Sequence, residues 1–295
     1  MATGASRFYS LREDDVEQGS KEWRRLRYEA AGSTGSVLTT ALGKLPYPAR
    51  DYPCPAGVSQ AAFNRELHIR RAAGEIPEEV SRNTGDLDAD RMRCGTSLEP
   101  AIRVMLHKVL GVPITPLPSI VTPEYGMRIS PDGFVWGHDV PCELKAPRQV
   151  KRLRCARHPR GNAECPKCIS FVVGIYEDQV QAEMYAVGNA PSCFFTQLET
   201  MPFIEEVLHI PGGRDAGMDV CARVADFCRD CVQDVPGIFP RGKGPGDYIY
   251  TIVVPRDATW AERVGPQIEA CAREIRARRE KIGMTFERYC EMNNL

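Results

Sequence analysis

The sequence predicts an α/β fold in which one mixed β-sheet is flanked by helices. Two observations lead to this prediction. Helix-like and strand-like stretches follow in the order helix, helix, several strands, helix, strand, strand, helix, which is typical of a sheet covered by helices. The 295 residues are 43% hydrophobic and 26% charged, as in ordinary globular proteins, and a chain of this length can bury a substantial core. No internal repeat is visible, and the length alone allows one large domain or two.

The first two predicted helices lie in the N-terminal half of the chain. Ser20 is a suitable N-cap for a helix over "KEWRRLRYEA". The tract 43–57, "GKLPYPARDYPCPAG", holds too many prolines for regular structure and predicts a surface loop. A second helix is predicted over "SLEPAIRVMLHKVLG", with Ser97 ahead of it and Gly111 closing it. Its apolar residues fall on one face: Leu98, Ile102, Met105, Leu106, Val109 and Leu110.

Strands and two further helices are predicted in the rest of the chain. Strand-like runs occupy 119–122, 126–130, 133–136 and 141–146, and two more occupy 193–199 and 248–254. A helix over 175–188 ends at Gly188, and a long last helix starts near Ala258. The apolar stripe of the first comprises Tyr176, Val180, Met184 and Val187; that of the second comprises Trp260, Val264, Ile268, Cys271 and Ile275.

Charge and cysteine content limit the classes of function. The formal net charge of -1 excludes a uniformly basic surface, so a nucleic-acid partner requires a local basic patch. The N-terminal residues show no signal sequence, and no apolar run is long enough to span a bilayer, so we expect a soluble intracellular protein without a membrane partner. Twelve cysteines are unusual for a compartment that keeps thiols reduced. Lone ones such as Cys193 and Cys271 are expected to be small core residues.

The stretch 129–147, "ISPDGFVWGHDVPCELKAP", combines acids and a lysine in a hairpin pattern. Its turn returns the chain so that Asp132 and Glu143 approach each other, and Glu143 and Lys145 share one strand face. Two converging carboxylates suit Mg²⁺ or Mn²⁺, and a neighbouring ammonium can hold a metal-bound water for phosphodiester hydrolysis. The alternative is an exposed hairpin with a Glu–Lys pair on its solvent face.

Four motifs in a fixed order extend this interpretation: "QGSKEWRRLR", "RCGTSLEPAI", "SPDG…CELKAP" and "YEDQVQAEM". With them the chain resembles the YqaJ-type viral recombinase family, the lambda-exonuclease-like (alkaline exonuclease) branch of the PD-(D/E)XK nucleases. The resemblance runs from about 18 to about 188, with a weaker match in the C-terminal helix. It implies a restriction-endonuclease-like core within a single nuclease domain over 1–295. A basic Cys/His-rich insertion at about 148–170 and a C-terminal helix at about 258–282 would belong to that domain.

The resemblance also implies which residues form the reaction centre. Asp132 and Glu143 would bind the metal together with Glu99 and the backbone of Leu144, and Lys145 would be the catalytic lysine. The family's glutamine beside the active site corresponds to Gln179 here, and Tyr176 would pack there. Alternatives remain, because acids such as Glu99 are common in the first turn of a helix, and Gln179 could be a solvated helix position.

A set of DNA-contacting positions follows from the same resemblance and from a basic run. The segment "EWRRLRYEAAGSTGSVL" resembles the part of the family that meets the terminal phosphate, and a glycine and hydroxyl turn is a suitable anion site. This chain departs from the family in having Glu29 two residues after the arginine, where glycine is usual, and "GST" in place of Thr-Ala-Ser. The run 148–160, "RQVKRLRCARHPR", carries six Lys or Arg in thirteen residues. The predicted contacts are Trp23, Arg27, Gly32, Ser33, Thr34, Lys151, Arg152 and Arg154. A helix N-cap and a solvated basic face are the alternatives.

The function implied is that of a metal-dependent deoxyribonuclease that degrades double-stranded DNA from an end, 5′ to 3′. By kinship it would act in viral or phage recombination, replication or repair, in the host cytoplasm or nucleus if viral. A single-strand annealing partner and a homo-oligomer are implied in the same way. One alternative is an iron–sulfur-containing PD-(D/E)XK nuclease using Cys165, Cys168, Cys228 and Cys231. The other is a catalytically idle DNA-binding protein, against which the intact set of Asp132, Glu143 and Lys145 argues.

The segment "CARHPRGNAECPKC" suggests a second metal site outside the family pattern. Cys155, His158, Cys165 and Cys168 form two closely spaced pairs, C-x2-H and C-x2-C, which could surround one tetrahedral zinc ion. Four protein ligands leave no open position, so such a zinc would be structural. The alternative is an insertion without fixed structure that carries free thiols and an imidazole.

Overall fold

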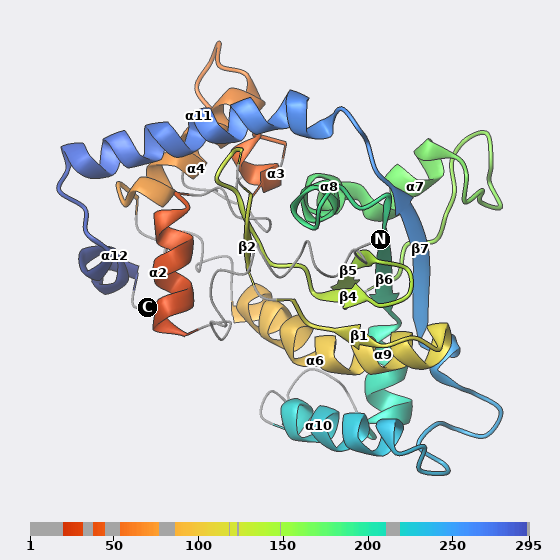
Figure 1. The fold of residues 1–295 in the computed structure, drawn as a ribbon. Helices are drawn as coiled ribbons and strands as arrows, with labels where there is room; N and C mark the ends of the chain where they lie inside the picture. Colours follow the sequence, from red (N-terminus) through yellow and green to blue (C-terminus); the bar gives the residue numbers. More distant parts are fainter. Residues whose placement is uncertain are drawn as a thin grey trace, which may run out of the picture.

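A five-stranded sheet lies at the centre of the molecule, with helices on both of its sides (Figure 1). The computed structural model describes residues 20–31, 38–44, 54–76, 86–117, 119–122, 124–147, 149–210 and 219–293. The strand order is β1-β4-β5-β6-β7. The pair β5–β6 is parallel, and the pairs β1–β4, β4–β5 and β6–β7 are antiparallel. The predicted mixed α/β architecture is therefore confirmed. The strands are β1 (Ile114–Thr115), β4 (Gly133–Val135), β5 (Val140–Lys145), β6 (Ser192–Leu198) and β7 (Ile249–Pro255).

Two predicted strands do not join this sheet. β2 (Ile120–Val121) and β3 (Arg128–Ile129) pair only with each other, as an antiparallel hairpin. Its turn is closed by Thr122, which receives a side-chain hydrogen bond from the Met127 amide at 3.0 Å and donates its own amide to the Met127 carbonyl at 2.8 Å. The prediction that both runs belong to one sheet was wrong because hydrogen bonds within the hairpin satisfy them locally. β1 was not predicted, since two residues are too few to form a recognisable alternation.

Two helices cover the sheet from opposite sides, and both reach the candidate site. These are α6 (Asp86–Leu110) and α8 (Glu177–Ala186), the latter following a 3₁₀ turn, Gly174–Tyr176 (Figure 1). The sequence placed Ser97 just ahead of a helix, but α6 begins at Asp86, so Glu99 lies in mid-helix and not in a first turn. Val109 was predicted on the buried face, yet it is 48% exposed, whereas Leu106 in the preceding turn is fully buried.

Further helices surround this centre. α2 begins as predicted, since the Ser20 hydroxyl accepts a hydrogen bond from the Trp23 amide at 3.1 Å. Helices α4, α7, α10 and α12 were not predicted. α9 continues into a π-helical turn, Phe203–Val207, and a 3₁₀ turn, Pro245–Asp247, precedes β7. The bounds are α2 (Lys21–Glu29), α3 (Leu38–Ala41), α4 (Gln60–Ala73), α7 (Pro166–Val173), α9 (Thr200–Pro202), α10 (Asp219–Val232), α11 (Trp260–Lys281) and α12 (Phe286–Asn293).

The long helix α11 is fixed by its apolar stripe and by one buried acid. All five residues predicted to lie inside on this helix are at most 3% exposed. The carboxylate of Asp178 accepts hydrogen bonds from the Trp260 indole at 3.0 Å and from the Lys44 ammonium at 2.7 Å, which joins α11 and the end of α3 to α8. Among the described helices, none combines the length and the apolar character needed to cross a bilayer.

Gly265 on α11 offers a test of this packing. A Cβ atom at this position would lie 2.4 Å from the ring of Tyr125, which the loop between β2 and β3 supplies. We expect Gly265→Ala to lower the free energy of unfolding by about 1–3 kcal/mol, as overpacking does. The matched control is Gly95→Ala on α6, where no atom of the described residues lies within 4 Å of the added atom, and it should raise stability by about 0.5–1 kcal/mol. Chemical denaturation measures both, and equal effects would contradict the packing described.

Candidate metal and catalytic site

The hairpin of β4 and β5 brings Asp132 next to Glu143. Pairing between the two strands ends at Gly133 opposite Cys142, so Asp132 stands one residue before β4 and faces the continuation of β5. There the Leu144 amide donates a hydrogen bond to Asp132 Oδ2 at 2.8 Å. The carboxylate thus takes the position that a further residue of β4 would occupy in the ladder. The predicted approach of the two acids follows from the strand register.

Lys145 lies between these two carboxylates. Its Nζ atom forms an ion pair with Glu143 Oε1 and lies 3.8 Å from Asp132 Oδ2. The ammonium also lies 4.9 Å from the ring centroid of Tyr176, and that ring packs on Phe195. Burial alone would lower the pKa of Lys145, but the Glu143 and Asp132 carboxylates outweigh it and raise this pKa, so the ammonium stays charged.

Helix α8 contributes a glutamine and a second acid. The Gln179 amide nitrogen donates to Glu143 Oε1 at 2.7 Å and to Glu183 Oε1 at 3.3 Å. Gln179 and Glu183 lie four positions apart and share one helix face. The Gln179 side chain therefore holds two carboxyl groups, those of Glu143 and Glu183. The Cys193 thiol is 3.9 Å from the other oxygen of Glu183. Gln179 is therefore a site-facing residue and not a solvated one.

Helix α6 approaches from the other side with Glu99 and Arg103. The Arg103 guanidinium donates two hydrogen bonds to the Asp132 carbonyl, at 3.2 and 2.7 Å, which fixes the start of β4. Glu99, four residues earlier on the same face, is near enough to Lys145, Glu143 and Arg103 for their charges to act on its pKa. The structure thus places Glu99 beside the acids from the hairpin.

The electrostatics of the site fit a hard divalent cation. Burial raises the pKa of Glu99 to about 7, opposed by Lys145 and increased by Glu143. Burial and the Glu143 carboxylate also raise the pKa values of Asp132 and Glu183 well above their usual range. Four acids therefore face two cations, Lys145 and Arg103 (the acids are Glu99, Asp132, Glu143 and Glu183).

A single oxygen atom shows where a cation would bind. Glu143 is fully buried, and among the described residues no donor reaches its Oε2 atom. A buried carboxylate oxygen without a donor is costly unless a charge compensates it. Mg²⁺ and Mn²⁺ prefer carboxylate and carbonyl oxygens. The carboxylates of Glu99, Asp132 and Glu143 are of the donor type that such an ion prefers, but among the described residues their oxygens do not converge as closely as the ligand atoms of the Cys155 cluster do.

Two residues of the site were missed in the sequence. Glu183 is 0% exposed, and the helical stripe of Tyr176, Val180, Met184 and Val187 gave no reason to expect a buried acid. Its position four residues after Gln179 was the available signal, because such a pair shares a helix face. Arg103 stands in the same relation to Glu99. Another acid, Glu124, lies at the edge of this region, where it accepts a hydrogen bond from the Tyr185 hydroxyl at 2.8 Å.

The predicted DNA contacts lie on two other parts of the molecule. The Arg27 guanidinium stacks on the Trp23 ring at 4.4 Å on α2, which lies beside α12 and apart from the sheet in Figure 1. Gly32, Ser33 and Thr34 lie outside the described residues. After β5, Arg152 forms an ion pair with Glu199 at 2.7 Å, and Arg154 lies 4.5 Å from the Phe171 ring centroid. Lys151 is exposed in the same segment.

The cysteines of the iron–sulfur alternative do not come together. Within the described ranges, Cys165 and Cys168 group with Cys155 and His158. Cys228 and Cys231 belong to α10, which packs on α6 at the far side of the sheet from α7 (Figure 1). The C-x2-C spacing of each pair is local, but the two pairs lie on opposite sides of the sheet, so the four cysteines named for this alternative do not form one cluster in this structure.

Two solved structures illustrate what this chain is similar to. Both are of LHK-Exo, an alkaline exonuclease from Laribacter hongkongensis. The first covers 90% of this chain and 96% of the other chain, with a TM-score of 0.49 and 17% sequence identity. The second, in complex with dAMP, covers 89% and 96%, with a TM-score of 0.47 and 15% identity. No protein-family model matches the chain, and no curated protein sequence matches it.

Binding of a divalent cation at the acids can be tested directly by thermal unfolding. We expect Mg²⁺ or Mn²⁺ to stabilise the protein by about 2.7 kcal/mol at a hundred times its dissociation constant. Asp132→Asn should lose this effect, because a neutral amide can still accept the Leu144 hydrogen bond but no longer attracts the ion. Differential scanning calorimetry with and without cation measures the shift. The control is Glu280→Gln, an exposed acid on α11, which should respond as the wild type does. An unchanged cation effect in Asp132→Asn would contradict the site.

Proposed function

We propose that the protein is a divalent-metal-dependent deoxyribonuclease that degrades double-stranded DNA from an end. The observation that carries this proposal is the position of Lys145 between Asp132 and Glu143, where Glu143 also has a buried oxygen without a donor. Carboxylates that can hold a cation, with an ammonium among them, suit hydrolysis of a charged phosphodiester. The motif order that resembles the lambda-exonuclease-like nucleases supports the same reaction class.

The site residues have two roles in the proposed reaction, metal binding and stabilisation of charge. Glu99, Asp132 and Glu143 would hold Mg²⁺ or Mn²⁺, together with the backbone of Leu144. When bound, such an ion lowers the pKa of a coordinated water and neutralises charge on the scissile phosphate. Lys145 would orient the attacking water and stabilise the negative charge that develops on the phosphate oxygens.

Two groups position the others. Gln179 holds the Glu143 carboxylate through one amide hydrogen and Glu183 through another, so the orientation of Glu143 depends on α8. The ring of Tyr176 limits where the Lys145 ammonium can move. Both contacts fix the reacting groups before substrate arrives, which is how electrostatic stabilisation of a transition state avoids reorganisation.

The substrate and biological setting belong to the proposal by resemblance. Trp23, Arg27 and residues 32–34 would meet the DNA end, and the basic segment with Lys151, Arg152 and Arg154 would follow the phosphate backbone. Degradation from 5′ to 3′, a role in viral or phage recombination, a single-strand annealing partner and assembly of several copies come from the same kinship.

Loss of the central acid should abolish hydrolysis. Glu143→Gln keeps the shape of the side chain and an acceptor for Gln179, so we expect the fold to persist and the rate to fall on the order of a hundredfold or more. Lys145→Ala should also abolish activity, but it leaves the Glu143 carboxylate buried without its ion-pair partner and should lower stability by about 3–5 kcal/mol. Digestion of labelled duplex DNA with Mg²⁺ measures the rate, calorimetry reports folding, and Glu280→Gln is the control. Normal activity of folded Glu143→Gln would refute the assignment, leaving a catalytically idle DNA-binding protein as the better interpretation.

The dependence on DNA ends can be tested with one pair of substrates. We expect a linear duplex to be degraded with Mg²⁺ and a covalently closed circle of the same sequence to be spared. The reason is that a DNA end must bind at Trp23, Arg27 and residues 32–34 before hydrolysis can begin. Gel electrophoresis over a time course distinguishes the two. Nicking the circle or linearising it should restore a starting point. Rapid cutting of the closed circle would show an endonuclease at the same centre.

A further inference from the structure

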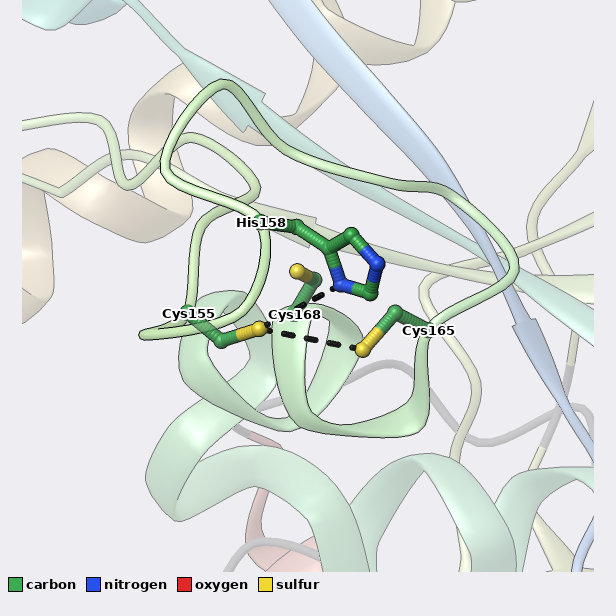
Figure 2. Close-up of side chains that lie close together, drawn as sticks. All are labelled: Cys155, His158, Cys165 and Cys168. Atoms are coloured by element: carbon green, nitrogen blue, oxygen red, sulfur yellow. Dashed lines mark hydrogen bonds between the residues drawn. The ribbon is translucent and has the colours of Figure 1, made fainter.

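Three cysteines and one histidine converge outside the carboxylate site. The ligand atoms of Cys155, His158, Cys165 and Cys168 all lie within 4.8 Å of one another. Figure 2 shows their side chains pointing into one space between a loop and the first turn of a helix. We propose that these four residues bind one Zn²⁺ ion that stabilises the segment between β5 and α8. This proposal does not depend on the nuclease activity.

The first pair of ligands is held by a tight hairpin. Cys155 and His158 exchange two backbone hydrogen bonds, at 3.1 and 3.0 Å, across the two residues between them. The chain then turns back at Gly161, whose φ of 85° lies in the left-handed region. A Cβ atom at Gly161 would lie 2.6 Å from the Leu153 carbonyl oxygen, so a side chain there has no room. In this conformation the backbone presents a thiol and an imidazole on one side of the hairpin.

The second pair comes from the N-terminus of α7. Cys165 is the N-cap residue, Pro166 occupies the first helical position, and Cys168 follows within the first turn. The Cys168 amide donates to the Cys165 carbonyl at 2.9 Å. Proline suits this position because it needs no amide donor and already has a helical φ. The Cys165 side chain makes no capping hydrogen bond to the helix, and its thiol points toward Cys155 (Figure 2).

The distances between ligand atoms fit a tetrahedral zinc ion. With Zn–S of about 2.3 Å and Zn–N of about 2.0–2.1 Å, a regular tetrahedron has edges of about 3.8 Å between sulfurs and about 3.6 Å between sulfur and nitrogen. The Cys155 and Cys165 sulfurs lie 3.8 Å apart, and the Cys155 sulfur lies 3.5 Å from His158 Nδ1. Two edges therefore already have the required lengths, and the remaining pairs, at up to 4.8 Å, need only a small contraction.

The ligand types distinguish this site from the carboxylate site. Thiolate and imidazole ligands select zinc, whereas the oxygens of Asp132 and Glu143 select Mg²⁺ or Mn²⁺. Four protein ligands close the coordination shell and leave no position for a reacting water. Cys168 is fully buried, which is consistent with a structural site.

The surrounding segment has little else to hold its shape. None of the residues 151–167 is buried, so the loop has no apolar core of its own. Its start is anchored, because Gln197 forms two hydrogen bonds with the backbone of Lys151, at 3.1 and 2.9 Å, and the Tyr250 hydroxyl accepts from the Leu153 amide. Within the described residues, the part of the loop after Leu153 has no such anchor. Small units without a core are commonly stabilised by a metal. Zinc would connect the hairpin to α7, which leads to Tyr176 and Gln179.

The metal content of the purified protein tests the proposal. Protein prepared without chelator should contain about one zinc per chain by elemental analysis, and excess Mg²⁺ should not displace it. Replacement by Co²⁺ should give the intense visible absorption of a tetrahedral cobalt–thiolate site. Removal of zinc with a zinc-selective chelator should abolish hydrogen-exchange protection over 155–168 and leave the anchored amides of Lys151 and Leu153, and β6 and β7, protected, because metal binding is coupled to folding of this loop.

Variants provide matched controls. Cys165→Ala with Cys168→Ala should lose the zinc, whereas Cys228→Ala with Cys231→Ala, the same C-x2-C spacing on α10, should keep it. His158→Cys should retain zinc with four thiolates, and His158→Ala should weaken binding at least tenfold. A metal-free wild type with a protected loop would overturn the proposal, as would a Cys155–Cys165 disulfide, a bound iron–sulfur cluster, or zinc retained by the Cys165 and Cys168 double variant.

Discussion

The hydrogen bond from the Leu144 amide to the Asp132 carboxylate is the contact on which the candidate site depends. It forms where β4 stops pairing with β5, so that a side chain replaces a strand at the edge of the ladder. One interaction thereby satisfies a backbone donor and fixes a carboxylate 3.8 Å from the Lys145 ammonium. Because Glu143 and Lys145 follow with the two-residue period of β5, the end of one strand pairing determines the position of all three groups.

This arrangement is unfavourable until a cation binds. Four carboxyl groups lie around a partly buried ammonium, and burial raises the pKa of three of them, Glu99, Asp132 and Glu183. Burial of charge is stabilising only when every group is compensated. The surrounding core supplies the difference, since α6 and α8 cover the sheet with fully buried residues such as Ile102 and Val180. A site of this kind lowers the free energy of unfolding, as is common where function requires clustered like charges.

Local patterns in the sequence predicted the parts of the molecule that depend on neighbouring residues. The alternation around Glu143 and Lys145, the Ser20 cap and the stripe of α11 are of this kind. The features that the sequence did not predict depend on contacts with residues far away in the chain. Glu183 is buried because Gln179 and the sheet cover it, and the hairpin of β2 and β3 leaves the sheet because pairing partners are not encoded by alternation. Ser97 resembled a helix start because serine and the following Pro100 suit a first turn, yet α6 extends further toward its N-terminus.

The parallel pairing of β5 with β6 has a consequence for the order in which the molecule folds. Parallel neighbours cannot be joined by a tight turn, so the chain between them passes through α7 and α8 and returns across the sheet. Closing so long a connection is unfavourable in entropy, and the mutual repulsion of the acids does nothing to favour it. Apolar contacts of α8 with the sheet must therefore form before Gln179 can reach Glu143. A partly folded chain consequently lacks the complete candidate site, because the side chains from β5 and α8 come together only in the finished fold.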